Sequence, residues 1–309
     1  MPEPSSQRVG TFYALSAFIL WGLLPLYWRL LDAVPAHEIL AHRTLWSFVF
    51  ASAVLVARGK RAFLQMLVHA ETRRTVVATG LLLGINWFTY IYSVNTGRVL
   101  QASIGYYINP LFSIFLGRVF LKERLSASQR IAVLFAACGV AVLTFGLGVV
   151  PWIALILMTT FGIYALIKKT VALEPLGALA VETLILTPPA AALILVGLLS
   201  GRGALASINL RTDILLLLTG IVTALPLYWF ARAARSIPLA RVGFIQYITP
   251  TLMFLIGVLL FDEPFTVVHA VSFSCIWTGI AVYLLSHSRP IRRLDARYAA
   301  FMDARTNRG

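Results

Sequence analysis

The sequence predicts an all-α integral membrane protein with ten transmembrane helices, arranged as two inverted-topology repeats of five helices each. Composition gives the first indication, because 59% of the 309 residues are hydrophobic and only 12% are charged, whereas soluble globular chains have about 45–50% apolar and about 25% charged residues. Ten separate apolar segments give the second indication. The third is an internal repeat, in which the chain matches itself at a constant offset of 140 residues.

A transmembrane helix needs about 20 mostly apolar residues, and each of the ten segments approaches that length. The segments lie at residues 11–31, 39–57, 76–94, 100–119, 129–146, 151–167, 178–198, 213–231, 240–260 and 268–286. The stretch before the first segment is short and polar, and no clear small-residue cleavage site follows it. We therefore expect the first segment to remain as a helix rather than to be removed as a signal peptide.

Lysine and arginine residues are concentrated in alternate connections of the predicted bundle. The connections after segments two, four, six and eight and the C-terminal tail carry most of them, whereas the opposite connections carry few. Because basic residues favour cytoplasmic loops, both termini are predicted to be cytoplasmic. The same distribution argues against a nucleic-acid partner despite the formal net charge of +14, since the charges form short clusters between apolar runs rather than one basic face.

The clearest part of the repeat is an apolar run with a proline in its middle. Superposing its two copies without a gap aligns Tyr107 with Tyr247 and Pro110 with Pro250. Each unit holds five segments, an odd number, so the second unit must enter the membrane from the opposite side. The predicted domains are a cytoplasmic N-terminus at 1–10, five-helix repeats at 11–146 and 151–286, and a basic cytoplasmic tail at 287–309.

Two stretches outside the apolar segments have an amphipathic character. In the tail, arginines alternate with apolar residues near helical spacing, which suits a short helix on the anionic cytoplasmic leaflet, although a frayed polar tail fits the pattern as well. The connection at 58–75 carries apolar residues between basic ends and can lie along the same interface. The two cysteines, Cys138 and Cys275, are within apolar segments and are expected to be small buried hydrophobic residues.

Recognisable catalytic and cofactor-binding motifs are missing from the sequence. It contains no HExxH, Walker A or GxSxG pattern and no cluster of cysteines or histidines with the spacing of metal ligands. We therefore expect no enzymatic activity, no cofactor and no bound metal. Without an ATP-binding motif, active transport would depend on a gradient, and no ATPase subunit is expected.

Pro110 and Pro250 lie near the middle of the fourth and ninth segments. A proline inside a membrane helix removes one backbone hydrogen bond and leaves a carbonyl group free, so these positions are either packing kinks or part of a cavity wall. Polar and aromatic residues on the same helical faces favour the cavity interpretation. The resulting candidates for contact with a solute or for a gate are Tyr106, Tyr107 and Asn109 in the fourth segment, with Gln246 and Tyr247 in the ninth.

Aromatic and amide residues in the third and eighth segments extend this candidate site. Asn86, Trp87 and Tyr90 lie deeper than an interfacial aromatic belt should, and Tyr228 falls at the matching depth of the second repeat. Aromatic faces beside an amide suit a pocket for a partly apolar or cationic solute.

Ionisable residues inside membrane segments are costly and usually functional. His42 and Glu182 coincide at the repeat offset and are our candidates for proton coupling, although structural pairing could also explain Glu182. Glu38 and Arg43 can be explained as snorkelling residues at the end of the second segment.

Two further pairs of repeat-related residues have structural explanations. Glu123 and Glu263 end the fourth and ninth segments beside charged neighbours and are expected to stabilise helix ends or loops. Gly139 and Gly279 allow the fifth and tenth segments to approach their neighbours closely, as small residues do in membrane bundles. Neither pair is expected to contact a solute.

Several short motifs are distributed over nearly the whole chain, from Gly10 to His287. They are Trp21-Gly22, the stretch from Glu38 to Arg43, Asn86-Trp87, Tyr107 to Pro110 with Lys122-Glu123, and Tyr247 to Pro250 with Asp262-Glu263. These motifs resemble those of the EamA-type members of the drug/metabolite transporter (DMT) superfamily, most closely the RarD group. The resemblance implies the EamA fold, with ten helices in two inverted units around a central cavity that opens alternately to each side. It also implies export or uptake of small metabolites or drugs across the inner membrane of a bacterium.

Together, these features predict a secondary transporter, with export favoured, that moves a small organic metabolite or drug by alternating access. Its expected partners are the small-molecule solute, protons and the lipid bilayer. Two alternatives stay open: an intramembrane enzyme that modifies a lipid, which would need an acid/base or metal cluster, and a membrane scaffold or sensor, which would need no cavity.

Overall fold

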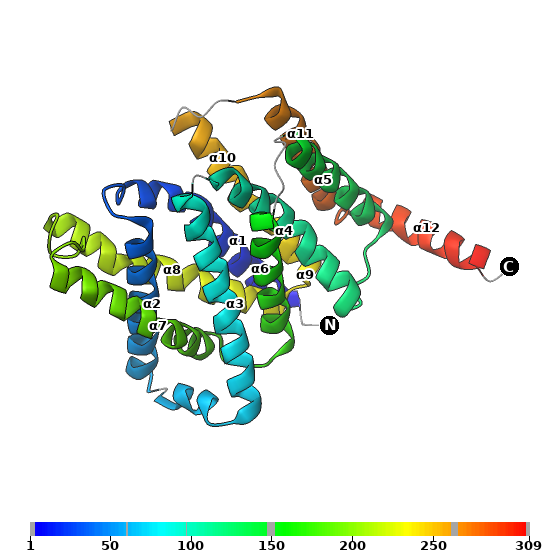
Figure 1. Ribbon diagram of the computed structural model, residues 1–309. Coiled ribbons are helices and arrows are strands. Elements are labelled where there is room, and N and C mark those ends of the chain that lie inside the picture. Colours follow the sequence, from blue (N-terminus) through cyan, green and yellow to red (C-terminus); the bar gives the residue numbers. More distant parts are fainter. Residues whose placement is uncertain (1–3, 60, 97, 147–151, 261–264, 307–309) are drawn as a thin grey trace.

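The computed structural model describes residues 4–59, 61–96, 98–146, 152–260 and 265–306. Throughout these ranges the regular structure is helical (Figure 1). The elements in chain order are α1 (Pro4–Arg29), α2 (Ala36–Ala57), the 3-10 helix η1 (Arg61–Leu67), α3 (Ala70–Asn95), α4 (Val99–Phe120), α5 (Ala127–Gly146), α6 (Trp152–Thr170), α7 (Pro175–Ser200), α8 (Leu210–Ser236), α9 (Leu239–Gln246), α10 (Ile248–Leu260), α11 (Val267–Leu285) and α12 (Arg289–Thr306).

Nine segments of the described chain are long and apolar enough to cross a membrane. They correspond to nine of the ten predicted segments, with α9 and α10 together forming the ninth. The remaining predicted segment, 100–119, coincides with helix α4, which includes residues whose side chains are outside the described part. Large apolar side chains such as Phe88, Phe145 and Leu199 are exposed on the surface, as expected for side chains that face lipid. The chain is therefore an all-α, multi-pass membrane protein.

Several helices are longer than the apolar segments that predicted them. Helix α1 begins at Pro4, so most of the predicted polar N-terminal stretch is helical, and α8 continues to Ser236. The hydrophobic core of a bilayer spans only part of the thickness of a membrane. Polar helical turns can therefore continue into the headgroup region, where hydropathy gives no indication of them.

Helices that are far apart in the sequence pack in pairs. Helix α5 packs against α11, α2 against α7 and α8, α1 against α8 and α10, and α6 against α3 and α4. In the α5–α11 pair, a Cβ atom added at Gly139 would lie 2.5 Å from the Ser272 carbonyl oxygen, and one added at Gly279 would lie 2.7 Å from that of Ala132. The expectation that both glycines serve close helix packing is thus confirmed.

The two proline-containing stretches differ in structure. Helix α4 is continuous through Pro110, whereas the ninth segment is interrupted at Tyr247, between the end of α9 and the start of α10. Pro250 has no amide hydrogen to donate to the carbonyl group one turn earlier, so an interruption at this point costs little additional hydrogen bonding. At Gly243, α9 approaches α4 so closely that an added Cβ atom would lie 2.6 Å from the Pro110 carbonyl oxygen.

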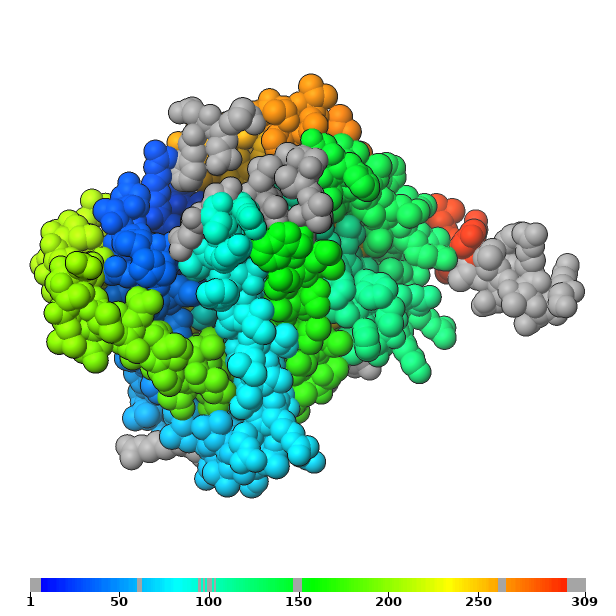
Figure 2. Space-filling view, viewed as in Figure 1, coloured from blue at the N-terminus to red at the C-terminus, as the bar shows by residue number. Residues whose placement is uncertain are grey.

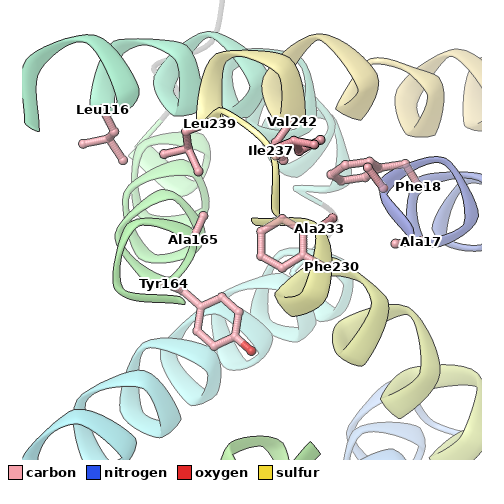
Figure 3. Close-up of a cluster of buried hydrophobic side chains, with 11 residues drawn as sticks. Ala17, Phe18, Leu116, Tyr164, Ala165, Phe230, Ala233, Ile237, Leu239 and Val242 are labelled. Atoms are coloured by element: carbon pink, nitrogen blue, oxygen red, sulfur yellow. The ribbon is translucent and has the colours of Figure 1, made fainter. Parts of the chain in front are cut away.

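The largest group of buried apolar side chains, here called the packed cluster, joins α1, α4, α6, α8 and α9 (Figure 3). It consists of Ala14, Ala17, Phe18, Leu116, Tyr164, Ala165, Phe230, Ala233, Ile237, Leu239 and Val242. The Phe230 ring is at its centre, 6.2 Å from the Tyr164 ring and 6.0 Å from the Phe18 ring. Figure 3 shows these side chains converging from the separate helices, which closes the bundle at this level.

Helices α5 and α11 lie at one edge of the bundle, and α12 extends beyond them (Figure 1). Cys138 on α5 is exposed and Cys275 on α11 is half-buried, so the expectation that both are buried was wrong. These two helices pack mainly against each other, and their outer faces are therefore left to the lipid. In the face shown in Figure 2, α7 and α8 form the other edge of the bundle, and α3 and α6 lie between the two edges.

The amphipathic stretches are both helical in the described chain. The predicted interfacial connection at 58–75 contains η1, and the tail contains α12, which agrees with the helical rather than the frayed interpretation of the tail. Asp295 attaches α12 to the start of α5, because its Oδ1 atom accepts hydrogen bonds from the backbone amide and the hydroxyl group of Ser128, at 3.0 and 2.9 Å.

Candidate functional site

A cavity of about 110 Å³ lies inside the helix bundle. Its walls come from α1, α2, α3, α4, α6, α8, α9 and α10, and therefore from both halves of the chain. The lining residues are Phe18, Trp21, Leu24, Trp28, Arg43, Asn86, Trp87, Tyr90, Gly105, Tyr106, Asn109, Leu157, Phe161, Leu227, Gln246, Thr249, Pro250 and Met253. Aromatic and apolar side chains dominate, with a few polar groups among them, as in most small-molecule sites.

Seven of the residues that the sequence indicated meet at this cavity. They are Asn86, Trp87, Tyr90, Tyr106, Asn109, Gln246 and Pro250. The sequence had not indicated the walls that α1 and α6 supply, among them Trp21, Trp28 and Phe161. Trp21 belongs to one of the sequence motifs, but the motif does not indicate whether the Trp21 side chain points into the bundle or towards the lipid.

The cavity lies towards one face of the bundle. Its residues come from the later halves of α1 and α3 and the earlier halves of α4 and α6. The packed cluster uses the later halves of α4, α6 and α8 and the start of α9. Phe161 contacts both levels, with its ring 5.8 Å from Trp21 and 5.0 Å from Phe230. The bundle therefore contains a cavity on one side and is closed on the other.

Arg43 is the basic residue in the cavity lining. Its guanidinium carbon lies 4.4 Å from the ring centre of Trp87 and 5.7 Å from that of Trp28, distances at which a cation is attracted by an aromatic face. The Nε atom is buried and has no hydrogen-bond partner in the described part of the chain. The sequence had been consistent with a snorkelling arginine, but the side chain instead points into the bundle.

Amide and phenol groups complete the polar part of the lining. Asn86 donates hydrogen bonds to the Leu157 carbonyl oxygen at 3.0 Å and to the Thr160 hydroxyl oxygen at 2.9 Å, which fixes α3 against α6. The rings of Tyr90 and Tyr106 are 6.2 Å apart, edge to face. The side chain of Asn109 is only 6% exposed, and its Oδ1 atom has no partner among the described residues.

Tyr107 and Tyr247 are outside this cavity, although the sequence indicated them. Both belong to a buried cluster shared with α5 and α11, and the Tyr107 ring lies 5.5 Å from that of Phe273. The Tyr107 hydroxyl group donates to the Pro250 carbonyl oxygen at 3.1 Å and so joins α4 to α10. Pro110 is also outside the lining.

Tyr228 is likewise not among the lining residues of the cavity. It packs against two buried clusters, one that includes Leu55 of α2 and one that includes Leu83 of α3, and its ring is 6.4 Å from that of Tyr13. Its position is at an interface between helices, so its direct contact with a solute is not supported by this structure.

Glu182 is completely buried in α7 and has several partners. Its Oε1 atom lies 2.5 Å from the Lys168 ammonium nitrogen and accepts a hydrogen bond from the Thr79 hydroxyl group at 2.5 Å. The Tyr164 hydroxyl group donates to Oε2 at 3.3 Å. This buried network joins α3, α6 and α7 and touches the packed cluster through Tyr164.

His42 is also buried, in α2, and accepts a hydrogen bond on Nδ1 from the Trp46 indole nitrogen at 3.1 Å. Four residues earlier, the Glu38 carboxylate accepts a hydrogen bond from the Ala204 amide at 2.7 Å. That contact fixes α2 to the connection between α7 and α8. Glu38 is thus a structural residue rather than a freely snorkelling one.

Glu123 stabilises the start of a helix from another part of the chain. Its two carboxylate oxygens accept hydrogen bonds from the backbone amides of Leu239 and Ala240, at 2.7 and 2.9 Å, at the N-terminus of α9. A carboxylate at this position satisfies otherwise unpaired amides and interacts favourably with the helix dipole. The structural role expected for Glu123 is confirmed, while Glu263 is outside the described residues.

Comparison with known proteins identifies the family. A model of the EamA-like transporter family matches residues 8–145. The uncharacterized transporter YojE of Bacillus subtilis is 43% identical over 289 residues, which cover 92% of this chain and 96% of the relative. The chain belongs to the EamA-like transporter family.

Further relatives of this EamA-family transporter are consistent with the assignment. Protein RarD of Escherichia coli is 38% identical, with 92% of this chain and 96% of the relative covered. A solved crystal structure of a protein with 20% sequence identity superposes with a TM-score of 0.68 and covers 92% of this chain and 99% of its own, which shows a shared fold. These bacterial relatives are named as transporters or as RarD, and not as enzymes.

Proposed function

We propose that this EamA-family transporter moves a small organic solute across the bacterial inner membrane by alternating access, with export as the physiological direction. The observation that carries the proposal is the cavity of about 110 Å³ that both halves of the chain line and that the packed cluster closes on one side. A binding site inside the bundle that is reached from one side at a time is the requirement of this mechanism.

The proposal includes two inverted repeats, 11–146 and 151–286. Helix pairing supports it, because the α1–α8 contact corresponds to α6–α3, and α2–α8 corresponds to α7–α3. Close contacts follow the same relation: Gly22 faces Leu252, and at the offset of 140 residues Gly162 faces Phe112. Such paired contacts are expected when two similar units are related by a pseudo-twofold axis.

The proposed orientation has both termini in the cytoplasm, as the distribution of basic residues predicts. In that orientation the packed cluster closes the cytoplasmic side and the cavity lies towards the outer side. Single cysteines at the exposed positions Arg73 and Arg211, in a chain with Cys138→Ala and Cys275→Ala, would test it. An impermeant maleimide should label position 211 in intact cells and position 73 only after permeabilisation, and the reverse pattern would refute the orientation.

The transport test compares two substitutions on α10. Met253→Trp fills the cavity, whereas Leu259→Trp adds the same bulk at a side chain that is 70% exposed to the surroundings of the bundle. Purified protein is screened for thermal stabilisation by a metabolite and drug panel, and each hit is measured for flux in proteoliposomes. We expect Met253→Trp to abolish flux and Leu259→Trp to preserve it. Equal flux in both would show that the cavity is not the path.

Proton coupling through Glu182 and His42 is a second part of the proposal. Protonation of Glu182 would remove the negative charge that now holds Lys168, so the network could exist in two states. Glu182→Gln should abolish accumulation driven by a proton gradient and leave solute exchange intact. Unchanged accumulation would eliminate Glu182 as the coupling residue.

Neither alternative function gains support from the described residues. A scaffold or sensor would need no internal cavity, yet one is present. A lipid-modifying enzyme would need an acid/base or metal cluster, whereas the cavity lining contains no aspartate or glutamate, and the described chain contains no group of residues that could hold a metal ion.

A further inference from the structure

The charge inside the cavity distinguishes between classes of solute. Arg43 contributes a positive charge, and the lining residues that the structure describes include no aspartate or glutamate. An ionised group inside a membrane protein is costly unless a partner of opposite charge or a set of hydrogen bonds compensates it. In the described part of the chain, Lys168 and Glu182 form an ion pair, and Arg43 forms none.

The geometry of Arg43 leaves a specific part of its guanidinium group available. The face of the group is occupied by Trp87, whose ring centre is 4.4 Å from the guanidinium carbon. The N–H groups of arginine point outward in the plane of the guanidinium, in a fork that matches the two oxygens of a carboxylate. The buried Nε atom has no acceptor among the described residues, so an acceptor from a bound solute would complete its hydrogen bonding.

We propose that the cavity binds a small organic anion, whose carboxylate pairs with Arg43 and whose apolar body packs against the aromatic walls. The inference rests on the proposed transport function and specifies its class of solute. Trp21, Trp28 and Phe161 supply the apolar surface. One cation among the described lining residues matches one carboxylate rather than two.

The same geometry argues against the cationic solute that aromatic residues alone suggested. The aromatic face of Trp87 already carries the guanidinium group of Arg43, which would repel a second cation.

Asn109 adds a separate feature, because its buried Oδ1 atom lacks a donor within the described residues. A hydroxyl or N–H group on the same anion would satisfy it.

The first test uses the wild-type protein and probes with similar apolar bodies whose polar group is an anion, a neutral amide or a cation. Phenylacetate, 4-methylpentanoate and mandelate are compared with their neutral amides and with phenethylamine and isopentylamine, by thermal shift and by titration calorimetry in nanodiscs. We expect at least one carboxylate to bind about tenfold more tightly than its amide, as for a desolvated charge pair, and the amines not to bind. The proposal is overturned if no carboxylate binds, or if the amides or amines bind equally well.

The second test changes the charge on the protein. Arg43→Gln should weaken carboxylate binding by about tenfold or more, and Arg43→Lys should preserve the preference for carboxylate over amide with lower affinity, because lysine lacks the planar fork. The control Arg211→Gln removes a charge at an exposed position away from the cavity and should bind as the wild type does. Unchanged carboxylate affinity in a folded Arg43→Gln protein would contradict the proposal. If Arg43→Gln does not fold, unchanged carboxylate affinity in Arg43→Lys would contradict it, because lysine lacks the planar fork.

Flux measurements separate failure of this inference from failure of the transport function. The same probes are loaded into proteoliposomes with the wild-type protein. Carboxylates that bind but are not moved would refute transport and leave the anion site intact. Movement of amines or amides without carboxylates would refute the anion site and leave the transport function intact.

Discussion

Two basic residues inside the helix bundle, the buried Lys168 and the half-buried Arg43, have opposite surroundings. Lys168 lies on the closed side of the bundle, 2.5 Å from the Glu182 carboxylate and beside the ring of Tyr164. Arg43 lies at the cavity, stacked on Trp87, with no carboxylate partner in the described chain. A cation that is paired within the protein has its charge neutralised already, whereas a cation without a carboxylate partner can pair with an anionic ligand. This difference agrees with the proposal that the cavity side binds the solute, while Lys168 is already paired within the protein.

The largest effect is expected on the closed side. Lys168→Met would leave the Glu182 carboxylate buried with only neutral donors, and removing one partner of a buried ion pair typically costs about 3–5 kcal/mol. We expect that loss in the unfolding free energy, measured by steric trapping in micelles. The double variant Lys168→Met with Glu182→Leu should recover most of it. If the double variant is as unstable as the single one, the pair does not act as a compensated unit.

A smaller loss is expected where Glu123 holds the start of α9. Its carboxylate accepts two amide hydrogen bonds, and hydrogen bonds to a charged group contribute about 1.5–3 kcal/mol each at most. Glu123→Gln retains one acceptor oxygen and should speed hydrogen exchange at the Leu239 and Ala240 amides. Glu71→Gln, at an exposed position of α3, is the control. Unchanged exchange at α9 would mean that the carboxylate is dispensable for closing this side.

On the cavity side, removing the cation should change the unfolding free energy in the opposite direction. Arg43→Met eliminates a charge that has no carboxylate partner among the described residues and should raise the unfolding free energy by about 0.5–2 kcal/mol, the gain that is common when a functional group is sacrificed for stability. Lysine at the same position should give no gain. A loss of stability in Arg43→Met, measured by the same method, would show that Arg43 is structural, and the contrast with Lys168 would disappear.

Much of the fold could be predicted from the sequence because a long apolar run predicts a membrane helix. The direction in which each side chain points from its helix axis was less predictable. Neighbouring residues differ by about 100° around a helix axis, and in a mostly apolar helix the pattern does not distinguish a face towards lipid from one towards a cavity. Tyr106 lines the cavity and Tyr107 packs towards α11, a division that only the packed structure determines.

The interaction partners of the ionisable residues were the other property that could not be predicted from the sequence. Glu182 and Arg43 were both recognised as ionisable residues in membrane segments, but the partner of Glu182 is on another helix, and the lack of one for Arg43 depends on all the helices around the cavity. The two prolines also show that similar sequences can have different local structures. Pro110 and Pro250 align in the repeat, yet only the ninth segment is interrupted, because local sequence permits a break and tertiary packing decides it.

The smallest predicted effect is at the rim of the closed side, where Asp295 joins α12 to α5. Partial burial raises the pKa of this carboxyl group, but hydrogen bonds from Ser126 and Ser128 and the charge of Arg130 outweigh it and hold the pKa below its ordinary value of 3.8. A lowered pKa means that the contact stabilises docking at all pH values above the ordinary one. Its contribution is lost as the pH falls through the lowered pKa.

A spin label at position 293, on the exposed part of α12, can follow this contact in a chain with Cys138→Ala and Cys275→Ala. Its mobility should stay constant from neutral pH to about pH 5 and increase only below the ordinary carboxyl pKa. With Asp295→Ala added, the mobility should already be high at neutral pH and should not depend on pH, whereas the control Leu294→Ala should behave as the parent does. A mobility change centred near pH 6 would instead assign the docking of α12 to a histidine, because that is the range in which imidazole titrates.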